Sequence, residues 1–323
     1  MDFRQHKILV AALILASTML PTGCDNDDIF DDDSDNPGEG FRAPTAASKP
    51  NANKVYEFTP APGQFINQTD PGMSWTQSTT PTEAAEWALG RLNNGLYVSL
   101  GSFGGYIVVG FDHSIARRSD DYEIGIIGNA FNSRAGDSNE PGIVYVMQDT
   151  NANGLPDDTW YELRGSATQD PGTIRYYAVT YYRPESEGKP VRWTDNQGGE
   201  GEVPYLGMFH NQPYYYPVWI KSPTYTLSGT RLESKTTRLE SGNWSNPPYG
   251  WGYADNMGED VISLNDSQNC NRFRISDAID ADGKSVQLEY IDFVKVQTGV
   301  MSTAGILGEV STEVLGVIDL TLK

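Results

Sequence analysis

The chain has 323 residues, of which 38% are hydrophobic and 11% aromatic, so it can bury a substantial core in one large domain or two ordinary ones. It carries 43 acidic and 23 basic residues, which gives a net charge of −20 at pH 7. This charge would repel a polyanion, so the composition argues against a nucleic-acid partner.

The N-terminus has the pattern of a targeting segment. Arg4 and Lys7 precede an apolar run, residues 8–20, which is too short to span a bilayer comfortably. The sequence LPTGC that follows resembles a bacterial lipoprotein cleavage box, with proline where leucine is usual. It predicts a signal peptide over residues 1–23 and a lipidated Cys24 whose acyl chains hold the protein to a membrane. The alternative is an ordinary signal peptide with an incidental cysteine.

An acidic stretch follows this cysteine. Seven aspartates fall within residues 25–35, where mutual repulsion favours disorder. The stretch is either a solvated tether or the export signal that it resembles, which sends lipoproteins of Bacteroidetes to the outer cell surface. Residues 34–53 continue as a polar, proline-rich linker. The sequence therefore predicts a disordered tether over 24–53 and one folded domain over 54–323, anchored in the outer membrane and facing the cell exterior.

The folded part begins with one helix signal and continues almost entirely as strands. Thr80 can cap a helix that starts at Pro81 and that Asn93-Asn94-Gly95 ends. Runs of β-branched and aromatic residues, separated by turn residues, predict the strands. In chain order these runs cover residues 96–100, 106–111, 122–128, 142–149, 159–165, 173–183, 190–195, 225–233, 271–276 and 286–298.

This order of elements indicates the fold class. There is no alternation of strands and helices, and many strands joined by Gly and Asn turns predict an all-β, jelly-roll-like β-sandwich. Several strands are apolar on both faces, as the inner strands of a thick sandwich would be. The predicted fold is a single large sandwich with one short helix and long aromatic loops. The loops 197–224 and 241–260 are where function is expected.

The loop DTNANGLPDD, residues 149–158, has the ligand spacing of a calcium loop. Oxygen-bearing side chains stand at relative positions 1, 3, 5 and 9, with glycine at position 6 for a sharp turn. A bidentate ligand would have to come from Asp158, Glu162 or elsewhere. The alternative is a polar hairpin loop stabilised by Asx-turns. The predicted calcium ligands are Asp149, Asn151, Asn153, the carbonyl of Leu155, and Asp157.

A calcium ion in this loop would brace the exported domain. If Cys24 is lipidated, Cys270 has no partner within the chain, and the mature domain has no disulfide. A structural Ca²⁺ would then stiffen the loops instead.

Two aromatic loops are the predicted ligand site. The sequences NQPYYYPVWI and GNWSNPPYGWGYADN carry large rings between Gly and Pro residues. Such rings offer flat apolar faces that stack on sugars or planar macrocycles, although they could equally cover the ends of the sandwich. The predicted ligand-binding residues are Tyr214, Tyr215, Tyr216, Trp219, Trp244, Tyr249, Trp251 and Tyr253.

Signals of catalysis are few. The mature chain has two histidines, and the first of them, His113, follows a strand and is predicted to be structural. No nucleophile-elbow motif is present. Asp292 lies in an apolar strand and is predicted to pair with a buried Arg or with backbone amides. The sequence therefore predicts a protein that is not an enzyme.

Several stretches in order resemble a known family. They are VYEFTPAPGQFIN, SLGSFGGYIVVGFDH, YEIGIIGNAF, EPGIVYVMQDTNANGLPDDTWYEL, TYYRP and YIDFVKVQTG, and the likeness covers most of residues 55–315. They are similar to surface lipoproteins encoded beside vitamin B12 uptake systems in gut Bacteroidetes, the BtuH-like corrinoid-binding proteins.

This resemblance implies that the protein binds a corrinoid and hands it to an outer-membrane transporter. A corrinoid is a wide, partly apolar macrocycle fringed by amides, which suits an aromatic cleft with a polar rim. His210, beside one aromatic loop, could reach the cobalt. The alternative function is a glycan-binding surface module of a polysaccharide-uptake system that uses the same rings.

Overall fold

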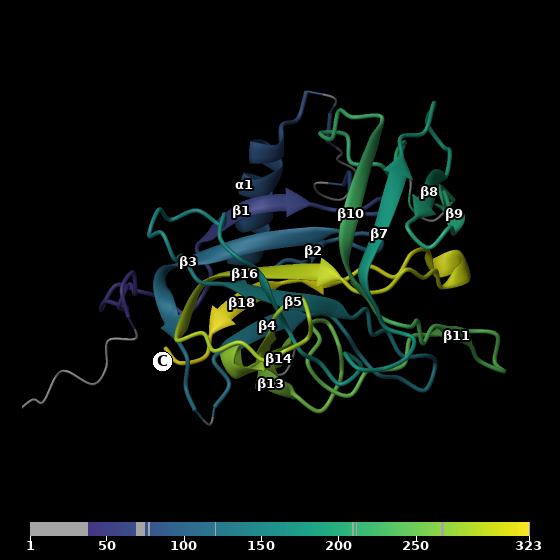
Figure 1. Ribbon diagram of the computed structural model, residues 1–323. Helices are drawn as coiled ribbons and strands as arrows, with labels where there is room; N and C mark the ends of the chain where they lie inside the picture. The colour runs from purple at the N-terminus through teal and green to yellow at the C-terminus, as the bar shows by residue number, and fades with distance from the viewer. Residues whose placement is uncertain are drawn as a thin grey trace, which may run out of the picture. The chain divides into compact units, whose positions relative to one another are not determined.

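The computed structural model describes residues 38–68, 75–76, 78–119, 121–208, 210, 212–265 and 268–322. Antiparallel strands in several sheets make up most of its regular structure (Figure 1). One α-helix, α1 (Pro81–Asn93), accompanies them within these residues. The prediction of an all-β sandwich with one short helix is confirmed.

The elements other than α1 are short. The strands are β1 (Lys54–Thr59), β2 (Val98–Ser99), β3 (Tyr106–Ala116), β4 (Ile124–Gly128), β5 (Gly142–Met147), β6 (Tyr161–Leu163), β7 (Ile174–Tyr182), β8 (Val191–Asp195), β9 (Glu200–Val203), β10 (Thr224–Arg231), β11 (Thr237–Arg238), β12 (Trp244–Ser245), β13 (Val261–Asn265), β14 (Gln268–Phe273), β15 (Ala278–Ile279), β16 (Tyr290–Thr298), β17 (Glu313–Val314) and β18 (Gly316–Asp319). Two single turns of 3-10 helix are η1 (Ile275–Asp277) and η2 (Gly305–Leu307).

A six-stranded sheet with the order β1-β3-β16-β5-β6-β15 is covered on both faces. Successive side chains of a strand point to opposite faces. On β16, Val294 and Val296 therefore join the main core, whereas Gln297 points the other way and donates from Nε2 to the Ser228 carbonyl of β10 at 3.2 Å. Burial on both sides explains why the sequences of β3 and β16 are apolar almost throughout.

A second sheet, β13-β14-β4-β18, contributes to the main core. Ile124 and Ile126 of β4 and Val317 of β18 lie in one buried cluster with Val294 and Val296 of the six-stranded sheet. Helix α1 adds its small buried side chains to the same cluster and lies beside β1 (Figure 1). Apolar burial between these layers is the main stabilising contribution to the fold.

A third sheet, β10-β7-β8-β9, is built around buried tyrosines. Tyr177 and Tyr181 of β7 lie in a separate core cluster with Phe103. The Tyr181 hydroxyl donates to the Phe103 carbonyl at 2.8 Å, which satisfies its polar end. In Figure 1, β7 and β10 run steeply across the strands of the six-stranded sheet. Two-residue pairs β11-β12 and β2-β17 complete the strand pairing.

The helix forms where the sequence predicts it. Thr80 and Glu83 make a capping box: the Glu83 N–H donates to Thr80 Oγ1 at 3.2 Å, and the Thr80 N–H donates to Glu83 Oε2 at 2.8 Å. Such a cap stabilises a helix by about 1 kcal/mol. The helix ends at Asn93, and Gly95 then takes a left-handed φ of 64°. Thr80, Pro81 and the stop at Asn93 are all as predicted.

The folded domain was predicted to begin at Lys54, but the packed part of the chain begins upstream of this residue. The Ala52 N–H donates to the Val317 carbonyl at 2.9 Å, and the Tyr290 hydroxyl donates to the Glu39 carbonyl at 2.6 Å. Residues 39–53 thus lie against the sandwich, although their polar, proline-rich composition indicates a linker. Residues Pro37–Lys323 form one compact unit.

The predicted signal peptide over 1–23, the lipidated Cys24 and the acidic stretch 25–35 lie outside the described residues. Within the described part of the chain, no helix has the length and hydrophobicity needed to cross a bilayer. Cys270 is free and fully buried on β14, and burial raises the pKa of its thiol to about 12.

Candidate functional site

Most of the rings predicted to bind a ligand are part of the core. Five of the eight are no more than 5% exposed: Tyr215, Tyr216, Trp219, Tyr249 and Tyr253. A ring whose two faces are packed against protein cannot stack on a ligand. These five residues are therefore corrected from ligand contacts to core residues.

The buried residue Asn67 explains why the first aromatic loop folds inward. Its Nδ2 donates to the carbonyls of Tyr214 at 2.7 Å and Tyr216 at 2.9 Å, and its Oδ1 accepts from the Val218 N–H at 3.1 Å. Three backbone groups of the loop thus find partners on one side chain. Trp219 then packs against Phe58, with ring centroids 5.8 Å apart.

The other three rings, Tyr214, Trp244 and Trp251, are half-buried. Trp251 lines a cleft of about 280 Å³ that Arg164 and Arg272 also line. Trp244 packs closely against Gly305. A Cβ atom on Gly305 would lie 2.3 Å from the indole Nε1 of Trp244. A ligand role for these three residues stays a prediction.

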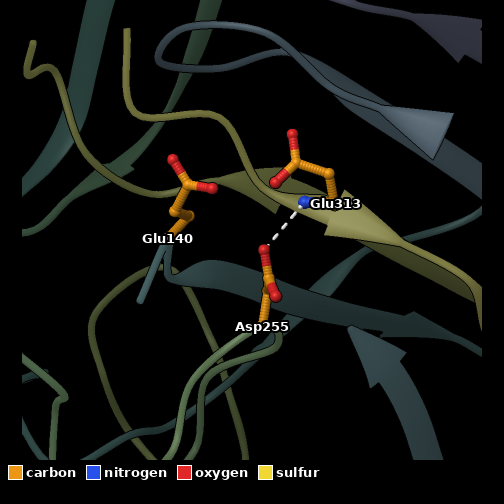
Figure 2. Close-up of side chains that lie close together, drawn as sticks. All are labelled: Glu140, Asp255 and Glu313. Atoms are coloured by element: carbon orange, nitrogen blue, oxygen red, sulfur yellow. Dashed lines mark hydrogen bonds between the residues drawn. The ribbon is translucent and has the colours of Figure 1, made fainter. Parts of the chain in front are cut away.

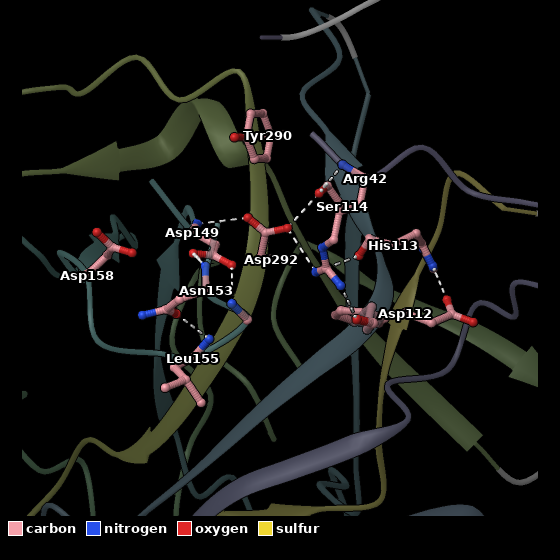
Figure 3. Close-up of polar contacts among 12 residues, drawn as sticks. Arg42, Asp112, His113, Ser114, Asp149, Asn153, Leu155, Asp158, Tyr290 and Asp292 are labelled. Carbon is pink, nitrogen blue, oxygen red and sulfur yellow. Dashed lines mark hydrogen bonds and ion pairs between the residues drawn. The ribbon is translucent and has the colours of Figure 1, made fainter. Parts of the chain in front are cut away.

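The predicted calcium loop makes a sharp turn, as its spacing indicates (Figure 3). Both carboxylate oxygens of Asp149 accept backbone N–H groups, from Asn153 at 3.1 Å and from Gly154 at 2.8 Å. Gly154 has a φ of 74°, which glycine adopts without strain. The Nδ2 atoms of Asn151 and Asn153 donate to Asp157, with shortest distances of 3.3 Å and 3.0 Å.

These contacts leave both interpretations of the loop open. Side-chain oxygens of the predicted ligands gather on one turn, as calcium binding requires, and Asn153 Oδ1 accepts from the Leu155 N–H at 2.7 Å. The same hydrogen bonds are those of an Asx-turn hairpin. Asp158, a candidate bidentate ligand, accepts from the Thr150 N–H at 3.1 Å. Calcium at Asp149, Asn151, Asn153, Leu155 and Asp157 stays a prediction.

Asp292 holds this loop to the rest of the domain. It is fully buried, and its Oδ2 accepts from the Asp149 N–H at 2.8 Å. Its Oδ1 accepts from Arg42 Nη2 at 2.9 Å and from Ser114 Oγ at 2.5 Å (Figure 3). A register shift between Ile291 and Phe293 breaks the alternation of β16 at this residue. Asp292 was predicted to pair with a buried Arg or with backbone amides; it does pair with a backbone amide, but its arginine partner, Arg42, is 39% exposed.

His113 is likewise a structural residue, as predicted. Its side chain is fully buried, with Nδ1 2.6 Å from Asp112 Oδ1 and Nε2 3.1 Å from Asp319 Oδ2. Both ring nitrogens are therefore engaged, and the three side chains tie β3 to β18.

A cavity of about 410 Å³ lies beside none of the predicted site residues except His210. Loops that are far apart in sequence converge on it. Part of the lining is apolar, and the rest is rich in amide and carboxyl groups. The lining residues are Gln64, Phe65, Tyr97, Asn129, Ser138, Glu140, His210, Asn246, Ala304, Ile306, Leu307, Glu309, Ser311 and Glu313.

The apolar side of this cavity is exposed to solvent. Ile306 and Leu307 of η2 are 61% and 56% exposed, and Tyr97 is 38% exposed. His210 packs edge-on against Phe65, with ring centroids 4.6 Å apart, and burial lowers its pKa. An uncharged imidazole therefore lies on the wall at neutral pH.

The polar side carries oxygens without partners. Gln64 Oε1, Asn246 Oδ1 and Glu309 Oε2 are buried and have no hydrogen-bond partner in the described part of the chain. Gly308 makes room for Gln64, because it has a φ of +92° and a Cβ there would lie 2.5 Å from Gln64 Oε1. Buried polar atoms are nearly always paired, so three unpaired oxygens on residues that line one cavity are unusual.

Glu140, Asp255 and Glu313 lie close together (Figure 2), and Glu140 and Glu313 also line this cavity. Glu140 precedes β5, Asp255 lies in the loop after β12, and Glu313 begins β17. Burial, with the neighbouring charge of Glu140, raises the pKa of Asp255 to about 8. Burial and the charges of Glu140 and Asp255 raise the pKa of Glu313 well above its ordinary value.

Sequence analysis did not single out these carboxyls, because acidic residues are abundant in the chain. A usable signal exists in their neighbours. Glu140 stands three residues before the apolar run that begins at Ile143, and Glu309 and Glu313 each directly precede a buried valine. Acidic residues embedded in apolar segments without adjacent Lys or Arg are candidates for buried carboxyls.

A comparison with models of known protein families finds no match to this chain, and a comparison with curated proteins finds none either.

Proposed function

We propose that this protein is a binding protein that captures a small molecule in the cavity lined by Gln64, Asn246 and Glu309, without making or breaking a bond in it. The observation that carries the proposal is the set of three buried, unpaired oxygens on residues that line this cavity. Its volume of about 410 Å³ lies in the range of small-molecule sites. No activated nucleophile with a base has been found among the residues that line it.

A corrinoid is the proposed ligand. Its peripheral amides would donate N–H groups to the three oxygens, which removes the cost of leaving them unpaired. Its apolar face would rest on Tyr97, Ile306 and Leu307. The macrocycle is wider than the cavity, so it would enter by one edge. The uncharged imidazole of His210 is the group on the wall that could approach the cobalt.

The sequence likeness to corrinoid-binding surface lipoproteins supports this choice of ligand. It extends the proposal to a protein anchored through Cys24 in the outer membrane and facing the exterior. In that setting the protein would hand its corrinoid to an outer-membrane transporter.

A glycan is the second candidate. Sugar hydroxyls would also donate to Gln64, Asn246 and Glu309, and the Tyr97 ring offers a face for stacking. A corrinoid is coloured and contains cobalt, whereas a glycan is colourless and metal-free. The same binding experiments can therefore distinguish the two ligands.

The test is calorimetry of the full-length chain against cyanocobalamin with calcium present. The expected result is one-to-one binding that Ile306→Arg weakens at least tenfold, because a charged side chain would stand on the apolar wall. Leu264→Arg, at an exposed leucine on β13 outside this cavity, is the matched control and should bind as the wild type does.

Absence of heat, together with failure to retain the red ligand on a spin filter, would reject the corrinoid. The same two variants would then be tested with host and plant glycans.

A further inference from the structure

Three carboxyl groups from distant parts of the chain converge on one point. One ligand oxygen from each of Glu140, Asp255 and Glu313 lies within 4.8 Å of the other two. In Figure 2 the three side chains point toward one another from separate segments. Two oxygens bound to the same Ca²⁺, at about 2.3–2.6 Å each, are at most about 5 Å apart. The spacing therefore fits a shared calcium ion.

The backbone holds these carboxyls in place and does not neutralise them. Asp255 Oδ1 accepts from the N–H groups of Asn129 at 2.8 Å and Ala130 at 2.7 Å, and its Oδ2 accepts from the Glu313 N–H at 2.9 Å. Glu140 Oε1 accepts from the Ser311 N–H at 3.1 Å. Within the described residues, no Lys or Arg forms an ion pair with any of the three carboxyls.

Two further residues that line the same cavity each have a buried oxygen without a partner. Glu309 is 4% exposed and Asn246 is 9% exposed, and both line the cavity together with Glu140 and Glu313. Glu309 Oε2 and Asn246 Oδ1 make no hydrogen bond within the described residues. Burial, with a smaller contribution from the charge of Glu140, raises the pKa of Glu309 to about 8. These atoms point to a missing cation independently of the three-carboxylate cluster.

We propose that Glu140, Asp255 and Glu313 bind a calcium ion at the floor of the cavity, with Glu309 and Asn246 supplying further oxygens. All the donors are hard oxygens, which suit Ca²⁺ and not a transition metal such as Zn²⁺. Four carboxylates without a basic partner would otherwise repel one another. The ion would keep some coordination positions open to the cavity, where a ligand oxygen could bind it.

This site is separate from the predicted calcium loop at Asp149. It shares the oxygens of Glu309 and Asn246 with the cavity of the proposed function, but binding of the metal alone tests it, so either proposal can fail without the other. Mg²⁺ demands a smaller octahedron with bonds of about 2.1 Å, so it should compete poorly.

The experiment is calorimetry of the full-length chain, stripped with EDTA, titrated with CaCl₂ and separately with MgCl₂. The wild type is expected to bind calcium with a dissociation constant of about 10⁻⁵ to 10⁻³ M. The double variant Glu140→Gln/Glu313→Gln should lose one calcium per chain, whatever the loop at Asp149 contributes. Glu289→Gln, at an exposed glutamate far from the cavity wall, is the matched control and should keep the wild-type number.

Folding of the double variant is checked by its thermal midpoint in EDTA. Glutamine preserves the shape and removes repulsion, so that midpoint should equal or exceed the wild-type value. Saturating CaCl₂ should raise the midpoint of the wild type by more than that of the double variant. The single variant Glu140→Gln, expected to weaken one site at least tenfold, serves if the double variant does not fold. An unchanged calcium number in a folded variant, or no binding by the wild type, would overturn the proposal.

Discussion

A single substitution at Asp292 should break hydrogen bonds that hold three segments of the domain together. Its carboxylate accepts from Arg42 Nη2, Ser114 Oγ and the Asp149 N–H at 2.9, 2.5 and 2.8 Å, and it is fully buried. The substitution Asp292→Asn keeps the volume but turns one acceptor oxygen into an NH₂ donor. If the NH₂ group takes the place of Oδ2, it faces the Asp149 N–H. If it takes the place of Oδ1, it faces Arg42 Nη2.

The expected loss follows from these contacts. A hydrogen bond to a charged group contributes about 1.5–3 kcal/mol, and a buried donor left unpaired costs about 1–3 kcal/mol. Arg42 is 39% exposed, so water can compensate part of its loss. We therefore expect Asp292→Asn to lower the free energy of unfolding by about 3 kcal/mol.

Urea unfolding of the full-length chain at pH 7, followed by tryptophan fluorescence, measures this change. Asp282→Asn is the matched control, because Asp282 pairs with Lys284 at the surface, where the side chains are 72% and 74% exposed. It should cost less than about 0.5 kcal/mol. A loss below about 1 kcal/mol for Asp292→Asn, with the denaturant slope unchanged, would refute the assignment of Asp292 as the anchor.

Three further outcomes are expected. Asn67→Leu leaves one N–H and two carbonyls of the aromatic loop unpaired and should cost about 3 kcal/mol in urea unfolding; a loss under about 1 kcal/mol would contradict its role. Burial lowers the pKa of Lys295 from 10.5 to about 8, so the unfolded chain binds more protons between these values and stability rises with pH there. Lys295→Met should remove that rise, and should stabilise the protein at pH 7 by about 2 kcal/mol; pH-independent stability of the wild type between pH 8 and 10 would refute this. Gly308→Ala strains a φ of +92° and displaces Gln64, so calorimetry should show cyanocobalamin bound at least tenfold more weakly than by the wild type.

Local patterns were sufficient for the helix and for the long strands. The helix has its cap at Thr80 and its stop at Asn93, both of which are short-range signals. Strands such as β7 and β16 are rich in β-branched and aromatic residues. β7 lies within one residue of both predicted ends, whereas β16 begins four residues after its predicted start and ends where predicted. β9 and β13 were missed because their sequences, EGEV and VISLN, are polar or short. Pairing with a neighbouring strand stabilises them, and sequence alone does not show that pairing.

The order of residues 39–53 could not be predicted for a related reason. Their composition is that of a linker, yet the Arg42 guanidinium meets Asp292 across 250 residues of sequence. The Asn53 N–H similarly donates to the Gly110 carbonyl at 3.0 Å. Order here comes from contacts with the sheet and not from local propensity.

The aromatic loops show the limit of composition as a guide to binding. All of these rings except Trp244, which begins strand β12, lie in loops as predicted, but a loop can fold back onto the sheet ends. Asn67, which lies about 150 residues before this loop, supplies the partners that make this possible for Tyr214 and Tyr216. Burial of the apolar rings removes their surface from water, which is energetically more favourable than exposure. A count of aromatic residues therefore cannot distinguish cover from a binding face.

Carboxyl groups that lie inside the protein without a basic partner are a better indicator of the candidate site than aromatic residues are. Glu140, Asp255 and Glu313 are held by backbone N–H groups and lie near one another without a basic partner among the described residues. An arrangement of this kind destabilises the empty fold, since each buried carboxylate loses its hydration. It is tolerable if protons or a cation neutralise the group, and a cation would be held most strongly where oxygens are otherwise unpaired. Asn246 and Glu309 provide such oxygens on the same cavity. The proposed ion and ligand, bound side by side, would account both for the cost of the buried charge and for the unpaired atoms.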